Sequence, residues 1–317
     1  MEKTEAYLFT HFKGTQKTPD DEQVYFAVSR DGYKWQNLNG GRPVLRSTLG
    51  EGGVRDPHII RKHDGSGFFL IATDLYIYGK WGENKEGWYR CQREGSRSIM
   101  IWKSDDLVNW SEQRMVKVAP DDASCAWAPE CIYDEKAGDY FVYWSSRCGF
   151  DGFAKQRIYS AHTKDFREFS EPKLYIERDF SVIDTTILPE NGKYYRLTKD
   201  HDETSIFMEV GTETEGEFAE LKDFTMKGKA GYEGPTMYRM NDGETWCMLL
   251  DAFATDGGYQ PFITKDLDSG IFTPQEDVYK RQPLASPLAS PLASPLASPS
   301  ARPSRFASAI AASTTYS

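Results

Sequence analysis

The chain repeats one local pattern four times, and no other feature of the sequence constrains its fold as strongly. Each copy begins with an acidic residue in a short corner containing Pro, Gly or Thr, continues into an apolar strand and is followed by an aromatic strand. The four corner segments are residues 54–60, 127–133, 182–188 and 232–238. A repeat of this kind determines the fold class before any motif is interpreted.

Each copy is predicted to continue as an antiparallel hairpin. The second strands are short and rich in aromatic and β-branched residues, and a Gly-containing turn precedes each of them. They are predicted at residues 68–73, 140–144, 194–198 and 246–250. A third strand ends in Ser or Thr, any residue and Asp, with an aromatic residue shortly after. This phrase occurs at residues 104–106, 163–165 and, more loosely, 264–266, and it is degenerate in the third copy.

The same phrase occurs near the N-terminus at residues 29–31, where strands are predicted at 7–12, 24–28 and 42–45. We therefore predict an all-β, five-bladed β-propeller formed by residues 1–277. A ring is favoured over a solenoid because each small sheet cannot bury both faces alone and must pack on its neighbours. The N-terminal blade lacks its first strand, which in such a ring normally comes from the C-terminus.

Residues 278–317 do not supply that strand by their sequence. Pro-Leu-Ala-Ser repeats four times in a Ser/Ala-rich segment that has too little large apolar surface to offset chain entropy. Proline at every fourth position also removes donors from a strand ladder. The run 278–282 resembles translated sequencing-adapter sequence. We expect residues 278–317 to be a disordered, non-native tail and the closing strand to be missing.

Composition and charge exclude several classes of function. Hydrophobic residues at 39% and aromatic residues at 14% are enough for one globular domain, and no run approaches the roughly 18 apolar residues of a membrane span. The formal net charge of −10 argues against nucleic acid or an anionic membrane surface as a partner. The first five residues show no apolar leader, so we expect a cytoplasmic protein. The oligomeric state is left open.

The metal-binding residue types form no recognisable pattern. The five cysteines are odd in number and lack Cys-x-x-Cys spacing, so neither a disulfide framework nor a zinc site is indicated. Of the five histidines only His58 lies on a predicted channel strand, and a lone His more often packs than binds a ligand. No metal site can be assigned and no cofactor is expected, with a structural channel cation left open.

Three of the corners supply carboxylates that the fold would bring together. The first strand of each blade lines the central channel, so Asp56, Asp184 and Glu233 are predicted to converge at one mouth of it. Repulsion between like charges in a partly dry funnel moves the pKa values of the carboxyl groups apart. One carboxyl then stays protonated near neutral pH while another is ionised. Glycosidic bond cleavage needs this division, because one group protonates the leaving oxygen while another activates water or attacks the sugar.

A turn-forming role is the alternative for each corner taken alone, since Asp before Pro or Thr often bonds its own backbone. Three carboxylates in equivalent corners favour chemistry, because ordinary propeller repeats put apolar or small residues along the channel. Glu130, in the second copy, is placed about one step further along its strand than Asp56. We expect a structural role for Glu130.

The corners resemble, in their order, the motifs of glycoside hydrolase family 43, the five-bladed arabinofuranosidases, xylosidases and arabinanases. The motifs are Arg-Asp-Pro at 55–57, Trp-Ala-Pro-Glu at 127–130, Ile-Asp-Thr-Thr at 183–186 and Glu-Gly-Pro-Thr at 233–236. The resemblance spans about Ala6 to Asp277 and is greatest to the exo-acting 1,5-α-L-arabinofuranosidases. It implies an inverting hydrolase in which Asp56 is the general base, Asp184 holds and tunes the acid, and Glu233 is the general acid.

Four further residues are predicted to bind substrate. Asp74 and Lys199 lie in segments that carry the resemblance. Trp127, next to a channel corner, and Trp81, in the long insertion after Asp74, are candidates to stack on sugar faces. One departure concerns the closing strand, where family members commonly carry a His near a channel water or cation.

The predicted activity is removal of terminal α-L-arabinofuranose from arabinan or arabino-oligosaccharides, as in hemicellulose degradation. The alternative is a β-D-xylosidase, because the two sugars present similar hydroxyl patterns, and exo and endo action are not separated by sequence. A non-catalytic carbohydrate-binding propeller is the alternative from another class. Fructan and sucrose hydrolases share Arg-Asp-Pro and Glu-Cys elements, but their Asn-Asp-Pro-Asn-Gly-type segment has no counterpart between Met1 and Gly53.

Overall fold

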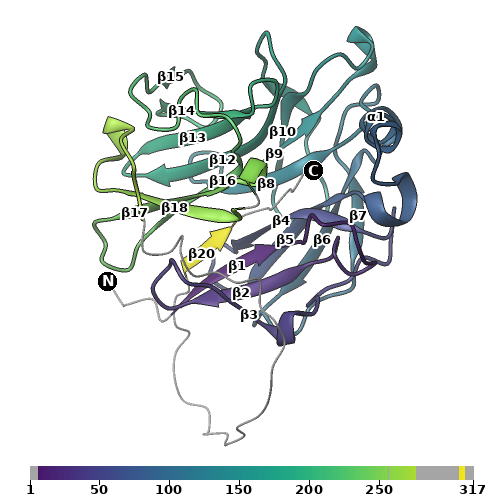
Figure 1. The fold of residues 1–317 in the computed structure, drawn as a ribbon, viewed down its shortest axis with the longest axis horizontal. Coiled ribbons are helices and arrows are strands. Elements are labelled where there is room, and N and C mark those ends of the chain that lie inside the picture. Colours follow the sequence, from purple (N-terminus) through teal and green to yellow (C-terminus); the bar gives the residue numbers. More distant parts are fainter. Residues whose placement is uncertain (1–5, 256, 276–306, 311–317) are drawn as a thin grey trace, which may run out of the picture.

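The computed structural model describes residues 6–255, 257–275 and 307–310. These residues form five four-stranded sheets arranged as blades around a central channel (Figure 1). The predicted all-β, five-bladed propeller is therefore confirmed. The inner strands β4, β8, β12 and β16 begin at the four acidic corners and contact their neighbours around the ring.

The strands are assigned to blades in chain order. Blade 1 contains β20 (Ala307–Ile310), β1 (Tyr7–His11), β2 (Tyr25–Ser29) and β3 (Gln36–Asn37). Blade 2 contains β4 (Val54–Arg61), β5 (Phe68–Asp74), β6 (Ser98–Ser104) and β7 (Arg114–Lys117), and blade 3 contains β8 (Trp127–Asp134), β9 (Asp139–Ser146), β10 (Arg157–Thr163) and β11 (Lys173–Ile176). Blade 4 contains β12 (Val182–Glu190), β13 (Lys193–Asp200), β14 (Ser205–Gly211) and β15 (Phe218–Glu220), and blade 5 contains β16 (Glu233–Arg239), β17 (Trp246–Asp251), β18 (Tyr259–Thr264) and β19 (Thr273–Pro274).

The second strands are hydrophobic on both faces because each blade is covered by a neighbour on either side. In β5, Phe69 and Ile71 pack into a cluster with blade 3, while Leu70 and Ala72 pack into a cluster with blade 1. Alternate residues of a strand point to opposite faces of the sheet, so this division follows from the period of the strand. The aromatic strands thus form the cores between blades.

The repeated Ser/Thr-x-Asp phrase forms the turn after the third strand of a blade. In three of its copies the hydroxyl accepts a hydrogen bond from the backbone N–H three residues later: Gly32 to Ser29 (2.8 Å), Leu107 to Ser104 (2.9 Å) and Phe166 to Thr163 (3.0 Å). The carboxylate of Asp31 or Asp106 accepts further N–H groups of the same turn. Side chains therefore satisfy the backbone where the ladder ends.

Blade 1 differs from the prediction at both ends. Its outer strand is Gln36–Asn37, while the predicted strand at 42–45 contributes only the isolated bridge between Val24 and Leu45. The expectation that the chain lacks a closing strand is also wrong, because Ala307–Ile310 pairs with β1 and contacts β4 and β16. This segment lies beyond the Pro-Leu-Ala-Ser repeat and contains no proline, so its backbone can form a ladder.

The closing strand has its own geometry. It runs parallel to β1, with Tyr7 opposite Ala307 and Thr10 opposite Ile310, whereas the inner strand of every other blade is antiparallel to its neighbour. The rest of the predicted tail lies outside the described residues.

Helices are few and peripheral. The insertion between β5 and β6 holds a π-helical turn, η2 (Ile77–Trp81), and the only α-helix of the described ranges, α1 (Lys85–Glu94), on the outside of the ring (Figure 1). Asn84 Oδ1 accepts the Gly87 N–H at 2.9 Å and caps α1. Short 3₁₀ turns lie at η1 (Asn39–Gly41), η3 (Gly149–Asp151), η4 (Phe253–Thr255) and η5 (Leu267–Ser269). No helix in the described part of the chain is long and apolar enough to cross a membrane.

Candidate active site

The four acidic corners share one backbone feature, a β-bulge near the start of the inner strand. In each, a pair of residues on the inner strand lies opposite a single residue of the second strand, so the register shifts by one residue. The first residue of each pair has a left-handed backbone, with φ of 49° at Asp56, 47° at Ala128, 53° at Asp184 and 52° at Gly234. Non-Gly residues seldom adopt this conformation, which places the bulge among the strained features that cluster at functional sites.

The second residue of each bulge explains the prolines of the corner motifs. Pro57, Pro129 and Pro235 occupy this position in three of the blades, and Thr185 in the fourth. A bulged residue is left out of the ladder, so the missing N–H of proline costs no hydrogen bond there.

The shared bulge also fixes how the carboxylates are offset. Asp56 and Asp184 occupy the left-handed position itself, whereas Glu233 stands one residue before it, level with Arg55. Glu130 is level with His58, two residues after the left-handed position. Glu130 thus lies two residues beyond the level of Asp56, and not about one step as predicted, because Ala128 occupies the left-handed position of its corner.

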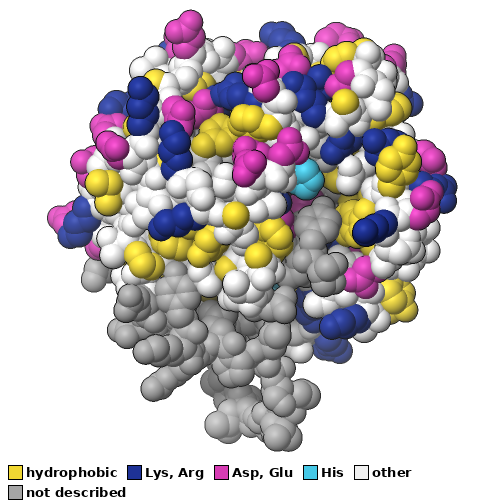
Figure 2. All heavy atoms as spheres, turned by 45° about the horizontal axis from the view of Figure 1, so that its top comes forward, with side chains coloured by type: hydrophobic (Ala, Val, Ile, Leu, Met, Phe, Trp, Pro, Cys, Tyr) yellow, Lys and Arg dark blue, Asp and Glu magenta, His cyan; other side chains and the backbone are white. Residues whose placement is uncertain are grey.

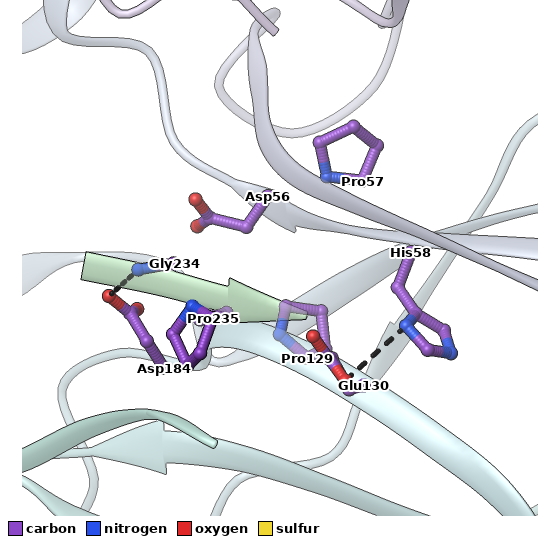
Figure 3. Close-up of a pocket in the computed structure, with 9 residues that line it drawn as sticks. Asp56, Pro57, His58, Pro129, Glu130, Asp184, Gly234 and Pro235 are labelled. Carbon is purple, nitrogen blue, oxygen red and sulfur yellow. Dashed lines mark hydrogen bonds and ion pairs between the residues drawn. The ribbon is translucent and has the colours of Figure 1, made fainter. Parts of the chain in front are cut away.

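Two adjoining pockets at the inner strands contain these groups. The first, here called the carboxylate pocket, is lined by Arg55, Asp56, Leu75, Trp127, Ile183, Asp184, Lys199, His201 and Glu233. The second, here called the channel pocket, is lined by Asp56, Pro57, His58, Ala128, Pro129, Glu130, Asp184, Gly234 and Pro235 (Figure 3). Asp56 and Asp184 line both, so the three predicted catalytic carboxylates are brought together in one pocket.

Asp56 is held as a buried, hydrogen-bonded carboxylate. Thr73 Oγ1 donates a hydrogen bond to its Oδ2 at 2.7 Å, and Ala128 N–H donates to the same Thr73 hydroxyl at 2.8 Å. Burial raises the pKa of Asp56 to about 6, against the lowering effect of the adjacent Arg55 guanidinium. A carboxyl with this pKa is ionised at neutral pH and can still accept a proton, as a general base must.

Arg55 is locked in place by blade 1 and the insertion. Its Nη1 lies 2.9 Å from Glu22 Oε1, with both side chains buried, and its guanidinium stacks on the rings of Phe12 and Trp88. Glu22 also accepts the backbone N–H groups of Ile77 and Tyr78 at the start of the insertion. These contacts tie three segments to the residue that precedes Asp56.

Asp184, Lys199 and Glu233 form the other side of the carboxylate pocket. Lys199 Nζ lies 2.5 Å from Glu233 Oε2, and Gly234 N–H donates a hydrogen bond to Asp184 Oδ2 at 3.3 Å (Figure 3). Burial raises the pKa of Asp184, while the Lys199 ammonium acts to lower it. Asp184 thus contacts the backbone of the residue that follows Glu233.

Glu130 and His58 face each other in the channel pocket, with Glu130 Oε2 3.6 Å from His58 Nδ1 (Figure 3). Burial raises the pKa of Glu130 to about 8 and lowers the pKa of His58 to about 3. Both groups are therefore neutral near pH 7. His58 Nε2 bonds the Cys131 carbonyl at 3.0 Å, and Glu130 Oε2 accepts a hydrogen bond from the Tyr143 hydroxyl at 3.4 Å.

Two of the four predicted substrate-binding residues line a pocket and two do not. Trp127 and Lys199 line the carboxylate pocket, but Asp74 and Trp81 line neither pocket. Asp74 accepts the Glu51 backbone N–H at 2.8 Å, and Trp81 Nε1 donates to Glu51 Oε2 at 2.6 Å. Both side chains therefore contact the segment around Glu51. His201, which sequence analysis passed over, lines the carboxylate pocket two residues after Lys199.

The surface and the polar clusters bear on possible partners. Lys and Arg are interspersed with Asp and Glu over the face seen in Figure 2, with no continuous basic patch for a nucleic acid. Across the residues with described positions, no group of three or more His, Cys, Asp or Glu side chains is placed to hold a metal ion.

A propeller whose inner strands bring three carboxylates into one pocket is the arrangement of a glycoside hydrolase. A family model described as "Probable glycosyl hydrolase domain", related to glycosyl hydrolase family 43, matches residues 2–285. The chain belongs to this family.

Comparisons with individual proteins agree with this assignment. An α-L-arabinofuranosidase of Bifidobacterium longum subsp. longum is 28% identical over 325 residues, a match covering 88% of this chain. The match covers 29% of that protein, so this chain spans less than a third of its length.

Solved structures of low sequence identity share the fold. A thermostable family-43 glycoside hydrolase superposes with a TM-score of 0.58 at 14% identity, covering 90% of this chain and 96% of its own. An exo-β-1,3-galactanase of Phanerochaete chrysosporium gives 0.60 at 9% identity, with 87% and 61% covered. An endo-1,4-β-xylanase of Bacteroides thetaiotaomicron gives 0.57 at 14% identity, with 86% and 94% covered.

Proposed function

We propose that the chain removes terminal α-L-arabinofuranosyl residues from arabinan or arabino-oligosaccharides by an inverting mechanism. The observation that supports this most strongly is the meeting of Asp56, Asp184 and Glu233 in one buried pocket. The similarity to an α-L-arabinofuranosidase supports the choice of sugar.

In the proposed reaction Asp56 accepts a proton from a water molecule as that water attacks the anomeric carbon. In the form of the enzyme in which Glu233 is protonated, Glu233 delivers its proton to the leaving oxygen, and the Lys199 ammonium 2.5 Å away stays charged and stabilises the carboxylate that remains. Asp184 keeps Glu233 in position through the Gly234 backbone. The glycosidic C–O bond breaks, a new C–O bond to water forms on the opposite face, and one proton is taken up at Asp56 for each proton released to the leaving group.

Two aryl glycosides test the proposal. We expect kcat/KM to be higher for an aryl α-L-arabinofuranoside than for the aryl β-D-xyloside. The reverse preference would indicate a xylosidase on the same three carboxylates. No release from either glycoside, with measurable binding of arabino-oligosaccharides, would indicate a binding propeller and would reject the enzymatic proposal.

A further inference from the structure

Two ring nitrogens at the carboxylate pocket have no hydrogen-bond partner among the described residues. They are Nε1 of Trp127 and Nδ1 of His201, and both atoms are buried. The other lining side chains are charged groups or the apolar Leu75 and Ile183. A buried polar atom is normally hydrogen-bonded, so these two nitrogens point to a ligand that supplies the missing bonds.

Trp127 is held rigidly. Its ring packs in a cluster with Leu75, Cys125 and Ile183, and only 4% of the residue is exposed. It stands one residue before the left-handed position of its corner, level with Glu233 in blade 5. The bulge that places the acid therefore also places this indole, whose Nε1–H can only donate.

His201 is fixed by its backbone and is neutral at physiological pH. Its N–H donates to the Ser181 carbonyl at 2.9 Å, just after β13 ends. Burial, together with the Lys199 and Arg147 charges, lowers the pKa of His201 to about 4. A neutral imidazole offers one donor and one acceptor nitrogen. A sugar hydroxyl can pair with Nδ1 in either tautomer.

We propose that Trp127 Nε1–H and His201 Nδ1 hydrogen-bond hydroxyl groups of the terminal sugar and determine which sugar the pocket accepts. This inference rests on the proposed function, because the sugar whose anomeric carbon lies between Asp56 and Glu233 must occupy the pocket that these two rings line. Apolar contact alone discriminates weakly between similar sugars, whereas a buried donor left unpaired by the wrong sugar discriminates strongly.

Side-chain substitutions that remove one of the two nitrogens test the proposal. Trp127→Phe keeps an aromatic ring and removes Nε1–H, and His201→Leu removes Nδ1, while His201→Asn restores a polar group near the Nδ1 position. We expect Trp127→Phe and His201→Leu to lower kcat/KM on both an aryl glycoside and an oligosaccharide, on the order of 10- to 100-fold. His201→Asn should recover most of the loss.

Trp144→Phe is the matched control. Trp144 lies on β9 in the same blade, and its Nε1 is also buried without a partner in the described ranges, but it belongs to the core between blades and lines neither pocket. We expect its kcat/KM to stay within about twofold of wild type. Equal losses for Trp144→Phe and Trp127→Phe would show a general packing effect and would overturn the inference for Trp127.

Deoxy sugars identify the bonded hydroxyls. If Trp127 Nε1–H bonds one hydroxyl, the glycoside lacking that hydroxyl should lose activity with wild type and lose little more with Trp127→Phe. If the losses in kcat/KM from Trp127→Phe and from the deoxy sugar are additive at every hydroxyl position, the assignment to the terminal sugar is wrong. A loss in kcat/KM for His201→Leu that is confined to oligosaccharides would also overturn it. Release of the aryl group by wild type tests the proposed function alone. The affinity of each variant for free L-arabinose, measured by calorimetry, tests sugar binding without catalysis.

Discussion

Lys199 Nζ and Glu233 Oε2 are 2.5 Å apart inside the ring, with only 2% and 0% of the two side chains exposed. A buried pair of this kind costs desolvation on both sides, and loss of one partner leaves an uncompensated charge. The relationship joins blades 4 and 5 at the pocket where the chemistry is proposed. We therefore expect substitutions of either residue to change the stability of the protein as well as its activity.

Lys199→Met should destabilise the protein by about 3–5 kcal/mol, because the Glu233 carboxylate loses the ammonium group 2.5 Å away in a dry environment. In a Glu233→Gln background the same substitution should cost much less, since no carboxylate remains to be compensated. Urea unfolding of the two single variants, the double variant and wild type gives the coupling energy. Additive costs would show that the two side chains do not depend on each other.

Thr73→Val should shift the acid limb of the pH profile. The Thr73 hydroxyl lowers the pKa of Asp56, which lies at about 6, so removing the hydroxyl raises that pKa. The base is active only when ionised, so kcat/KM should begin to fall at a pH higher by on the order of 0.5–1 unit. Thr73→Ser keeps the donor and should leave the limb in place. An unchanged limb for Thr73→Val would remove Asp56 as the group that sets it.

The roles of Glu233 and Asp56 can be separated by the leaving group. Glu233→Ala should lose on the order of 10²–10⁴ in rate on an oligosaccharide and much less on an aryl glycoside whose leaving group needs little protonation. Asp56→Ala should be strongly impaired on both, because every substrate requires the activated water. If Glu233→Ala loses equally on the two substrates, its assignment as the acid is wrong.

Glu130 should make stability depend on pH. Its pKa rises from the ordinary 4.5 to about 8 on folding, so the folded state holds a proton that the unfolded state releases. Wild type should therefore lose stability relative to Glu130→Gln as pH rises from about 4.5 to about 8, and the two should differ least below that window. Melting curves at pH 5 and pH 8 measure the change. Glu112→Gln, at an exposed position, is the control. A pH-independent difference would contradict a neutral Glu130.

The sequence predicted the ring because its repeat is visible at residue level, as corners, aromatic strands and Ser/Thr-x-Asp turns. It also predicted which carboxylates meet, since the first strand of every blade must face the channel. The offset among them was not visible, because the bulge at Asp56, Ala128, Asp184 and Gly234 appears only in the pairing register. Glu130, two residues beyond the left-handed position of its corner, therefore faces His58 in the channel pocket.

Other features depended on contacts between distant segments. His201 carries no motif, and only its place after β13, beside Lys199, brings it to the pocket. Asp74 and Trp81 form hydrogen bonds with Glu51 of the preceding loop and line neither of the two pockets. The closing strand was missed because residues 307–310 are mostly small (Ala-Ser-Ala-Ile) and carry no strand pattern, and the place of the strand is set by its pairing with β1.

The most direct test of the central claim is proton NMR of the sugar released from an α-L-arabinofuranosyl oligosaccharide in the first minutes of reaction. The account predicts release of single arabinose units whose first-formed anomer is β, because the water activated by Asp56 attacks the face opposite the leaving oxygen. An α anomer appearing first would show retention and would make one carboxylate a nucleophile. Absence of arabinose release would contradict the proposed activity itself.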